Sequence, residues 1–462
     1  MRIKTIPWFI LACTLTVACI HSATWQEILE SQFDIVETFD QLQDWSGEPD
    51  TGGMITDPEE MPKKLDNSSS IWQSYASGPG SWKAQWIGDH GAEYNWRSEK
   101  SLCMNYGTLY CEMDDEPLKG YGPDRLGTYF GDGTPQSGYR DIYVFFMMKI
   151  REGWFWNKPP PNDDEFSFPP AVKIFDINSG FTGIAMWGNT ACASNVQTEY
   201  GTSFSIWNIS AYGTEVFLRE GLSVDEYDSV NECYKYYKVR DGNKQEDTNL
   251  ENSYNNGEWF GVEIHLNLGS IGEPDGDMEV WTYDENGAQI GFEDELNVTM
   301  QTLLNYNYNR FAFGGNYQCT DPSQLGIITE TRFYIDDFIV DDQRIGPSYF
   351  ALLNNQPLPL TIGSLHESAV MNTVYSSTIS VRGGQPPYSM SVASGRLPED
   401  LTLNSISGNI SGIPKEPGSF PFTLEVVDST SPANTASREF SLTVSDNSSQ
   451  AIPLPPSGLK IR

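Results

Sequence analysis

The chain is poor in positive charge. Its 462 residues hold 28 lysines and arginines against 63 aspartates and glutamates, and the formal net charge is −35. So acidic a surface repels phosphates and anionic lipid head groups, which argues against nucleic acid or a membrane surface as a partner. It suits a secreted protein in saline surroundings, where salt screens the repulsion between its carboxylates.

Long helical patterns are also scarce, whereas aromatic residues make up 13% of the chain and glycine (41) and proline (28) are frequent. This composition predicts an all-β protein. At this length we expect two or three domains, each with a core of its own.

The N-terminus predicts export. In residues 1–23, Arg2 and Lys4 precede the apolar run IPWFILACTLTVAC, which is too short to span a bilayer as a stable helix and is typical of a signal peptide. Two cleavage sites compete. TVAC resembles a bacterial lipobox whose Cys19 would carry a lipid anchor, whereas cleavage within CIHSAT would give plain secretion. We therefore expect a protein that is secreted or held on the outer cell surface.

Cysteine is too sparse for a zinc site, since the sequence has no CxxC pair and no Cys/His spacing typical of zinc ligands. Export permits disulfides among the five cysteines that follow the signal. Cys103 and Cys111 are spaced to close a short loop. Cys192, Cys233 and Cys319 leave one odd thiol, and the sequence does not settle their pairing.

Between residues 33 and 347, short strand-like runs alternate with Gly, Asn and Asp turns, which predicts a sandwich or jelly roll. We expect a proline-containing linker at 348–359, a second β unit at 360–446 and a disordered tail, rich in Pro and Ser, at 447–462.

The second unit carries a specific set of short motifs. It resembles the immunoglobulin-like repeats of bacterial surface proteins, which implies a small immunoglobulin-like β-sandwich acting as a spacer or adhesive unit. The matching motifs are PY at 387–388, LP at 397–398, GNISGIP at 408–414, GSFPF at 418–422 and VDS at 427–429.

The first unit contains GEWFGVEIHLNLGSIGEPDGDMEVW at 257–281, NRFAFGGNY at 309–317 and RFYIDDFIVDDQRIGP at 332–347. With these stretches it resembles the concanavalin-A-like jelly rolls of bacterial polysaccharide-degrading proteins, including alginate-lyase and heparin-lyase-like sandwiches. The resemblance implies the fold more firmly than the activity. In the same families the strand like AVKIFDI holds a lysine near the cleft, which here is Lys173.

The E-x-D-x-E strand of the glycoside hydrolases on this sandwich is missing, which makes a hydrolase a weak hypothesis. A polysaccharide lyase must neutralise a uronate carboxylate, remove the adjacent proton with a base and protonate the leaving oxygen. Where alginate lyases carry an arginine strand, this chain has TGIAMWG, with Gly183 and Ala185, so that carboxylate neutralisation has no obvious residue.

Strand periodicity predicts which residues line a possible cleft. In VEIHLNL (262–268) apolar and polar residues alternate, so Glu263, His265 and Asn267 share the face opposite to the apolar row. If that face is the concave one, it forms a sugar groove with an aromatic platform. The catalytic candidates are then His265, Lys173 and Tyr143, and the substrate-binding candidates are Glu263, Asn267 and Trp281.

Each candidate has a structural alternative as well. His265 can be a hydrogen-bonded structural residue, Lys173 a solvated edge charge and Trp281 a part of the hydrophobic end of the sandwich. For His265 we expect the open groove, with Glu263 beside it raising its pKa, which suits binding a uronate more than abstracting a proton.

A structural calcium ion is a further hypothesis, because carboxylate oxygens suit Ca²⁺ and related jelly rolls often tie their first strand to the closing strand with an ion. The candidate ligands are Glu37, Asp40, Asp336 and Asp337. In so acidic a chain, carboxylates also meet by chance.

The sequence therefore predicts an exported two-domain β protein, a concanavalin-A-like jelly roll followed by an immunoglobulin-like sandwich, whose partner is an extracellular polysaccharide. The leading hypothesis is a lyase that cleaves a uronate-containing glycan by β-elimination. The alternative is a non-catalytic glycan-binding surface protein or adhesin.

Overall fold

The computed structural model describes residues 23–48, 54–76, 85–105, 119–134, 136–151, 171–179, 187–188, 196–197, 203–210, 215–228, 233–240, 254–255, 257–270, 273–298, 307–318 and 332–446. The expected signal peptide and tail lie outside these ranges, apart from residue 23, and so do Cys111, Cys192 and Cys319; those expectations stay predictions. None of the helices in the described ranges has the length and apolar character needed to cross a membrane.

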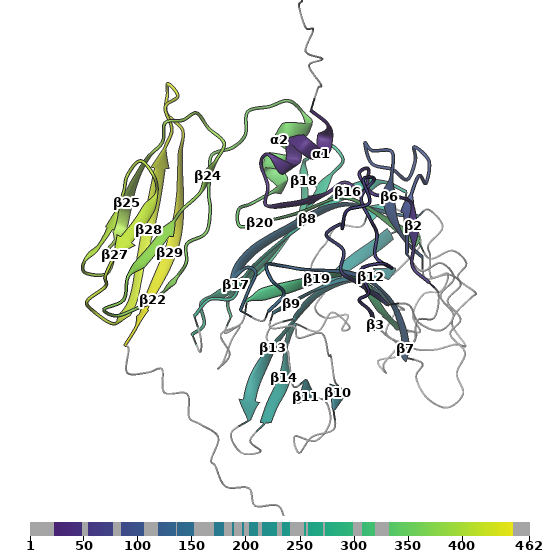
Figure 1. Cartoon of the computed structure of the whole chain (residues 1–462), viewed down its shortest axis with the longest axis horizontal. Helices are drawn as coiled ribbons and strands as arrows, with labels where there is room; N and C mark the ends of the chain where they lie inside the picture. Colours follow the sequence, from purple (N-terminus) through teal and green to yellow (C-terminus); the bar gives the residue numbers. More distant parts are fainter. Residues whose placement is uncertain are drawn as a thin grey trace, which may run out of the picture.

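Two nine-stranded sheets stack face to face in the first domain (Figure 1). We call them sheet I and sheet II. Sheet I has the order β18 (Gln289–Val298), β17 (Gly276–Asp284), β16 (Trp259–Asn267), β8 (Asp141–Ile150), β20 (Arg332–Asp341), β6 (Ser101–Asn105), β5 (Gln85–Gly88) and β2 (Trp45–Ser46), and β1 (Ile35–Glu37) pairs with β20.

Sheet II has the order β14 (Cys233–Arg240), β13 (Glu215–Asp228), β12 (Ser203–Ser210), β9 (Ala171–Ser179), β19 (Tyr308–Gln318), β7 (Lys119–Tyr129), β4 (Ser74–Ala76) and β3 (Met54–Ile55). β15 (Tyr254–Asn255) pairs with β13, and β10 (Trp187–Gly188) pairs with β11 (Val196–Gln197). All of these pairs are antiparallel.

The main core fills the space between the two sheets. Val262, Ile264, Leu266 and Leu268 are buried there, as their alternation predicts. From sheet II they meet aromatic side chains such as Phe175 and Phe311. A slip of one residue in the register of β16 would exchange this apolar row for charged residues, so burial fixes the register.

A second apolar cluster covers the outer face of sheet I. Helices α1 (Trp25–Glu30) and α2 (Gly346–Leu353) lie across that face (Figure 1). Phe145 and Met147 of β8 point out of the sheet and pack with Leu29 of α1 and with Tyr349 and Phe350 of α2. Sheet I is therefore buried on both faces.

The second domain is an immunoglobulin-like sandwich with a core of its own, which includes Phe422, Leu424 and Phe440. One sheet has the order β22 (Ser368–Val370), β29 (Thr435–Ser445), β28 (Gly418–Val427), β25 (Ser389–Gly395), the other β23 (Tyr375–Thr378), β27 (Asn409–Gly412), β26 (Leu401–Leu403), and β21 (Thr361–Ile362) pairs with β24 (Val381–Arg382). The all-β fold class, a jelly roll plus an immunoglobulin-like sandwich, is confirmed.

The stretch predicted as a linker, 348–359, is partly helical. Its first six residues belong to α2, which has Pro347 in its first turn and buries Tyr349 and Phe350 against Phe145. The two prolines at 357 and 359 follow the helix. The connection between the domains is therefore shorter than the sequence suggested, because apolar side chains hold its first part on sheet I.

Candidate functional site

His265 lies between two carboxylates on the outer face of sheet I. Its Nε2 is 2.7 Å from Oδ1 of Asp141 and its Nδ1 is 2.7 Å from Oε2 of Glu279. The imidazole stacks on the ring of Tyr143 at 4.2 Å with an interplanar angle of 11°, and the residue is 8% exposed. Both ring nitrogens therefore have partners from the protein.

Burial alone would lower the pKa of His265, but Asp141 and Glu279 outweigh it and raise the pKa to about 9. At neutral pH the ring is an imidazolium that donates from both nitrogens, so it has no lone pair with which to abstract a proton. The expected direction of the shift agrees with the structure, but its cause is different: Glu263 faces other partners. Burial likewise raises the pKa of Tyr143, which makes it a poor proton donor.

Glu263 holds the start of helix α2. One carboxylate oxygen accepts from the backbone N–H groups of Ile345 (2.6 Å) and Gly346 (3.1 Å), and the other accepts from the hydroxyl of Tyr283 (2.6 Å). Glu263 is completely buried. A carboxylate at a helix N-terminus satisfies otherwise unpaired N–H groups and interacts favourably with the helix dipole, so its role is structural.

The other two substrate-binding candidates are also engaged in the fold. The ring of Trp281 lies 4.2 Å from the guanidinium of Arg344 and is 6% exposed. The side chain of Asn267 accepts a hydrogen bond from the N–H of Gly269, which closes a turn after β16.

The expectation of an open groove on this face is wrong. The helices cover its middle, and Arg438 of the immunoglobulin-like domain reaches Asp141 beside His265. β8 carried a signal for this outcome: between Tyr143 and Lys149, its outward positions are Phe145 and Met147, which predicts burial on both faces.

The four calcium candidates lie at the junction of sheet I with the helices, and each accepts hydrogen bonds from the protein. Glu37 and Asp40 accept from backbone N–H groups, Asp336 from backbone and hydroxyl donors, and Asp337 from an indole and a phenol. A β-bulge after Asp336, with Asp337 at φ 48°, places both carboxylates on the helix side.

Burial raises the pKa of Glu37 to about 8 and that of Asp337 to about 6. In the described ranges, no group of three or more His, Cys, Asp or Glu residues is arranged to hold a metal ion. These carboxyls join α1 and α2 to sheet I, since Asp337 accepts from Trp25 and from Tyr349.

Lys173 lies on the other sheet, so the predicted catalytic residues do not share a groove. In sheet II it pairs with Trp207 of β12, which in turn pairs with Arg219 of β13. Directly paired residues of an antiparallel ladder lie on one face. On the other side of β9, Arg125 of β7 pairs with Gly314 of β19, on the face that points away from the core.

A second row of polar residues crosses the same face of sheet II. Arg310 of β19 pairs with Asn178 of β9 and donates to its side-chain oxygen at 3.2 Å. Further along this row, Ser223 of β13 pairs with Lys238 of β14. Arg310 is only 1% exposed, so it lies at the floor of this face.

Between the two rows the paired positions are small. Gly127, Ala312, Ser205 and Gly221 line up across four strands, with Asp176 among them. A Cβ on Gly127 would lie 2.7 Å from the hydroxyl of Ser74 and 3.3 Å from Nη2 of Arg310, so only glycine lets that arginine lie against β7.

Ladder pairing assigns both basic and acidic residues to the outer-face positions of sheet II. The positions whose face is fixed by pairing carry Arg125, Lys173, Arg219, Lys238 and Arg310 against Asp176, Glu215 and Asp225. The whole chain has 28 basic and 63 acidic side chains. Such a face can bind carboxylates or other anionic groups of an extended ligand.

The sequence contained the signal for Arg310. In NRFAFGG, Arg310 and Ala312 alternate with Phe311 and Phe313, so the arginine lies opposite to the core face. The family resemblance placed the arginine at TGIAMWG instead, whose first five residues lie outside the described ranges.

The comparison with family models supports the immunoglobulin-like second domain. A model of the family described as "Putative Ig domain" matches residues 355–445. No curated protein matches the chain. Solved structures with similarity include a marine PL-14 alginate lyase from Aplysia kurodai, at 12% identity over 59% of this chain and 99% of that one, with a TM-score of 0.33.

An alginate lyase from Chlorella virus has 11% identity over 57% of this chain and 93% of its own, with a TM-score of 0.30. A PL7 alginate lyase from Zobellia galactanivorans has 9% identity over 67% and 97%, with a TM-score of 0.26. With TM-scores below 0.5, these similarities carry no argument about the fold or the reaction; the jelly roll follows from the two stacked sheets of the chain itself.

Proposed function

We propose that this protein is an exported polysaccharide-active protein that binds an anionic glycan across the outer face of sheet II, and that it cleaves a uronate-containing chain by β-elimination. The observation that carries the proposal is the ladder of sheet II that pairs Lys173 with Trp207 and Trp207 with Arg219, in a chain of net charge −35. An aromatic residue beside cations suits a sugar ring that bears a carboxylate.

In this proposal the arginines of sheet II neutralise the uronate carboxylate, which lowers the barrier to removing the adjacent proton. Arg310 and Arg219 flank the row of small residues from two sides. Lys173 is the one predicted catalytic residue on this sheet, so we assign to its neutral amine the removal of the C5 proton and, once protonated, the return of that proton to the leaving glycosidic oxygen as the C4–O bond breaks. His265 and Tyr143 take no part, because they lie on sheet I under the second domain.

The test is incubation of the full chain with a panel of uronans and with neutral glycans, followed by absorbance at the band of the unsaturated uronate product. We expect the absorbance to rise with a uronan only. Lys173→Ala should abolish the rise, and Arg219→Ala should weaken uronan binding by about tenfold or more, as the loss of a charged contact does.

Arg396→Ala is the matched control. This arginine also carries one positive charge, but it lies 62% exposed in the second domain and pairs with Glu416. Its variant should bind like the unchanged protein. Equal weakening in Arg219→Ala and Arg396→Ala would mean that only net charge matters, and the proposed face would have to be given up.

A non-catalytic glycan-binding protein is the second candidate. It is favoured by the position of His265 and Tyr143, because two of the three predicted catalytic residues lie on the covered face of sheet I. It predicts that uronan binds to the outer face of sheet II, with the same response to Arg219→Ala, while no unsaturated product forms.

A further inference from the structure

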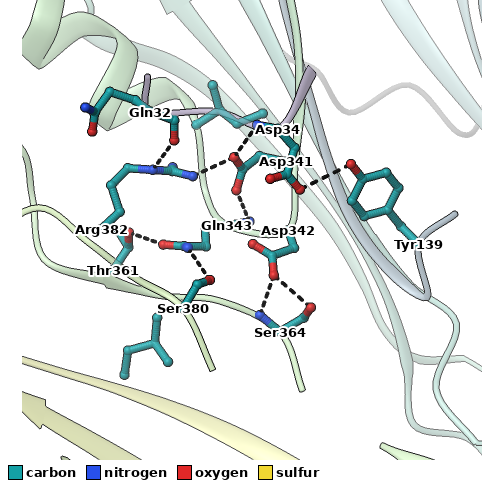
Figure 2. A network of polar contacts seen from close by, with 12 residues as sticks. Gln32, Asp34, Tyr139, Asp341, Asp342, Gln343, Thr361, Ser364, Ser380 and Arg382 are labelled. Carbon is teal, nitrogen blue, oxygen red and sulfur yellow. Dashed lines mark hydrogen bonds and ion pairs between the residues drawn. The ribbon is translucent and has the colours of Figure 1, made fainter. Parts of the chain in front are cut away.

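The contact between the two domains is built from charged side chains that are buried or partly buried. Arg382 of β24 is 7% exposed and its Nη2 lies 2.6 Å from Oδ2 of Asp341, which ends β20 and is 2% exposed. Its Nε donates to the carbonyl of Gln32 at 2.9 Å (Figure 2). The guanidinium also lies 4.5 Å from the ring of Phe33. One arginine of the second domain thus contacts two separate segments of the first.

Arg438 of β29 makes the second such contact. It donates through Nη2 to Oδ2 of Asp141 and through Nη1 to the carbonyl of Asp342 at 3.1 Å. Asp141 uses its other oxygen for His265, which is bound in turn to Glu279. The chain of charges therefore runs from the immunoglobulin-like domain across three strands of sheet I.

Neutral hydrogen bonds join the same surfaces. Gln343 donates to the hydroxyl of Ser380 at 2.9 Å and accepts from Thr361 at 2.6 Å. Asp342 accepts from the backbone and the hydroxyl of Ser364, each at 2.9 Å. Figure 2 shows these residues gathered around the segment that follows β20. Three consecutive jelly-roll residues, 341–343, are thus bound by side chains and backbone of the second domain.

We propose that the immunoglobulin-like domain is a fixed lid on sheet I, clamped by Arg382 and Arg438, and that it does not move as an independent spacer. Two ion pairs at separate points, a buried one between Arg382 and Asp341 and a partly buried one between Arg438 and Asp141, prevent the rotation that a single contact would allow. Removing Arg382 would leave the buried Asp341 without its ion-pair partner, and removing Arg438 would leave Asp141 with His265 alone, so each substitution weakens the closed arrangement.

The clamp lies away from the cationic rows of sheet II. It holds β8, β16 and β20 of sheet I, whereas the proposed glycan face consists of strands of sheet II. A test of the clamp is therefore independent of a test of the proposed function.

The experiment compares the full chain with the double variant Arg382→Met, Arg438→Met and with the control Arg396→Met. Small-angle scattering gives the radius of gyration, and a protease of broad specificity probes the connection at 354–360. In the double variant we expect a larger radius and cleavage of the connection about tenfold faster or more, since cleavage tracks the population of the opened form. The control should match the unchanged protein in both measurements.

Near-ultraviolet circular dichroism checks that each variant is folded. If the methionine double variant does not fold, the single variants Arg382→Lys and Arg438→Lys are measured in its place. Lysine keeps the positive charge but loses the forked donor geometry of arginine, so each variant should open the connection to a smaller extent than the double variant. A radius of gyration and a cleavage rate equal to those of Arg396→Met, in the double variant or in both lysine variants, would overturn the proposal.

Discussion

Replacing His265 by glutamine should destabilise the jelly roll in a way that depends on pH. The pKa of His265 is raised to about 9 in the folded protein, from 6.5 when unfolded, because the two carboxylates at 2.7 Å outweigh the effect of burial. A raised pKa means that the folded state holds the proton more tightly, so its contribution to stability is complete below pH 6.5 and is lost as pH rises through 9.

The size of this contribution follows from the shift. About 2.5 pKa units at 1.36 kcal/mol each correspond to about 3 kcal/mol in full, and to about 2 kcal/mol at pH 7.5, where the unfolded chain has already lost its proton. The charged groups that face His265 are Asp141, Asp277 and Glu279 from sheet I and Arg438 near Asp141. These groups are present in both proteins, so the difference in unfolding free energy between the unchanged protein and His265→Gln reports on the histidine itself.

The assay is denaturant unfolding followed by tryptophan fluorescence at pH 6, 7.5, 9 and 10. The stability lost in His265→Gln should shrink by about 3 kcal/mol between the first and the last pH. His90→Gln is the control, since burial lowers the pKa of His90 and its effect should not shrink over this range.

A loss that stays constant from pH 6 to pH 10 would refute the reasoning on the two carboxylates. Loss of glycan binding in His265→Gln at unchanged stability would return His265 to the binding site and would contradict its assignment to a structural network.

Three further outcomes are expected. Gly127→Ala should lower both the melting temperature and uronan binding, because a Cβ there meets Ser74 at 2.7 Å and displaces Arg310; calorimetry and a binding titration measure the two, and unchanged binding would exclude Arg310 from the site. Tyr349→Phe should cost about 1–3 kcal/mol in unfolding experiments, because it leaves the indole N–H of Trp96 and a buried carboxylate without their hydroxyl partner; a loss near zero would contradict this. Cys19→Ser should move the protein from the membrane fraction to the soluble fraction, and an identical distribution would exclude the lipid anchor.

The sequence by itself determined which residues form the core between the sheets. Alternation in VEIHLNL and DIYVFFMMKI placed Ile264 and Phe146 inward and His265 and Tyr143 outward, as the structure has them. The motifs from PY to VDS likewise predicted the immunoglobulin-like domain. Both are local patterns, and a period of two distinguishes the faces of a strand without any knowledge of its neighbours.

Only the tertiary structure decided what lies against each outer face. α1, α2 and Arg438, which cover the face of His265, come from segments more than 80 residues away along the chain, and strand periodicity carries no information about them. The same limit applies to Lys173, whose pairing with Trp207 and alignment with Arg219 depend on the order of strands in sheet II. Alternation separates one face of a strand from the other, but long-range packing determines whether a face meets water, a helix or a second domain.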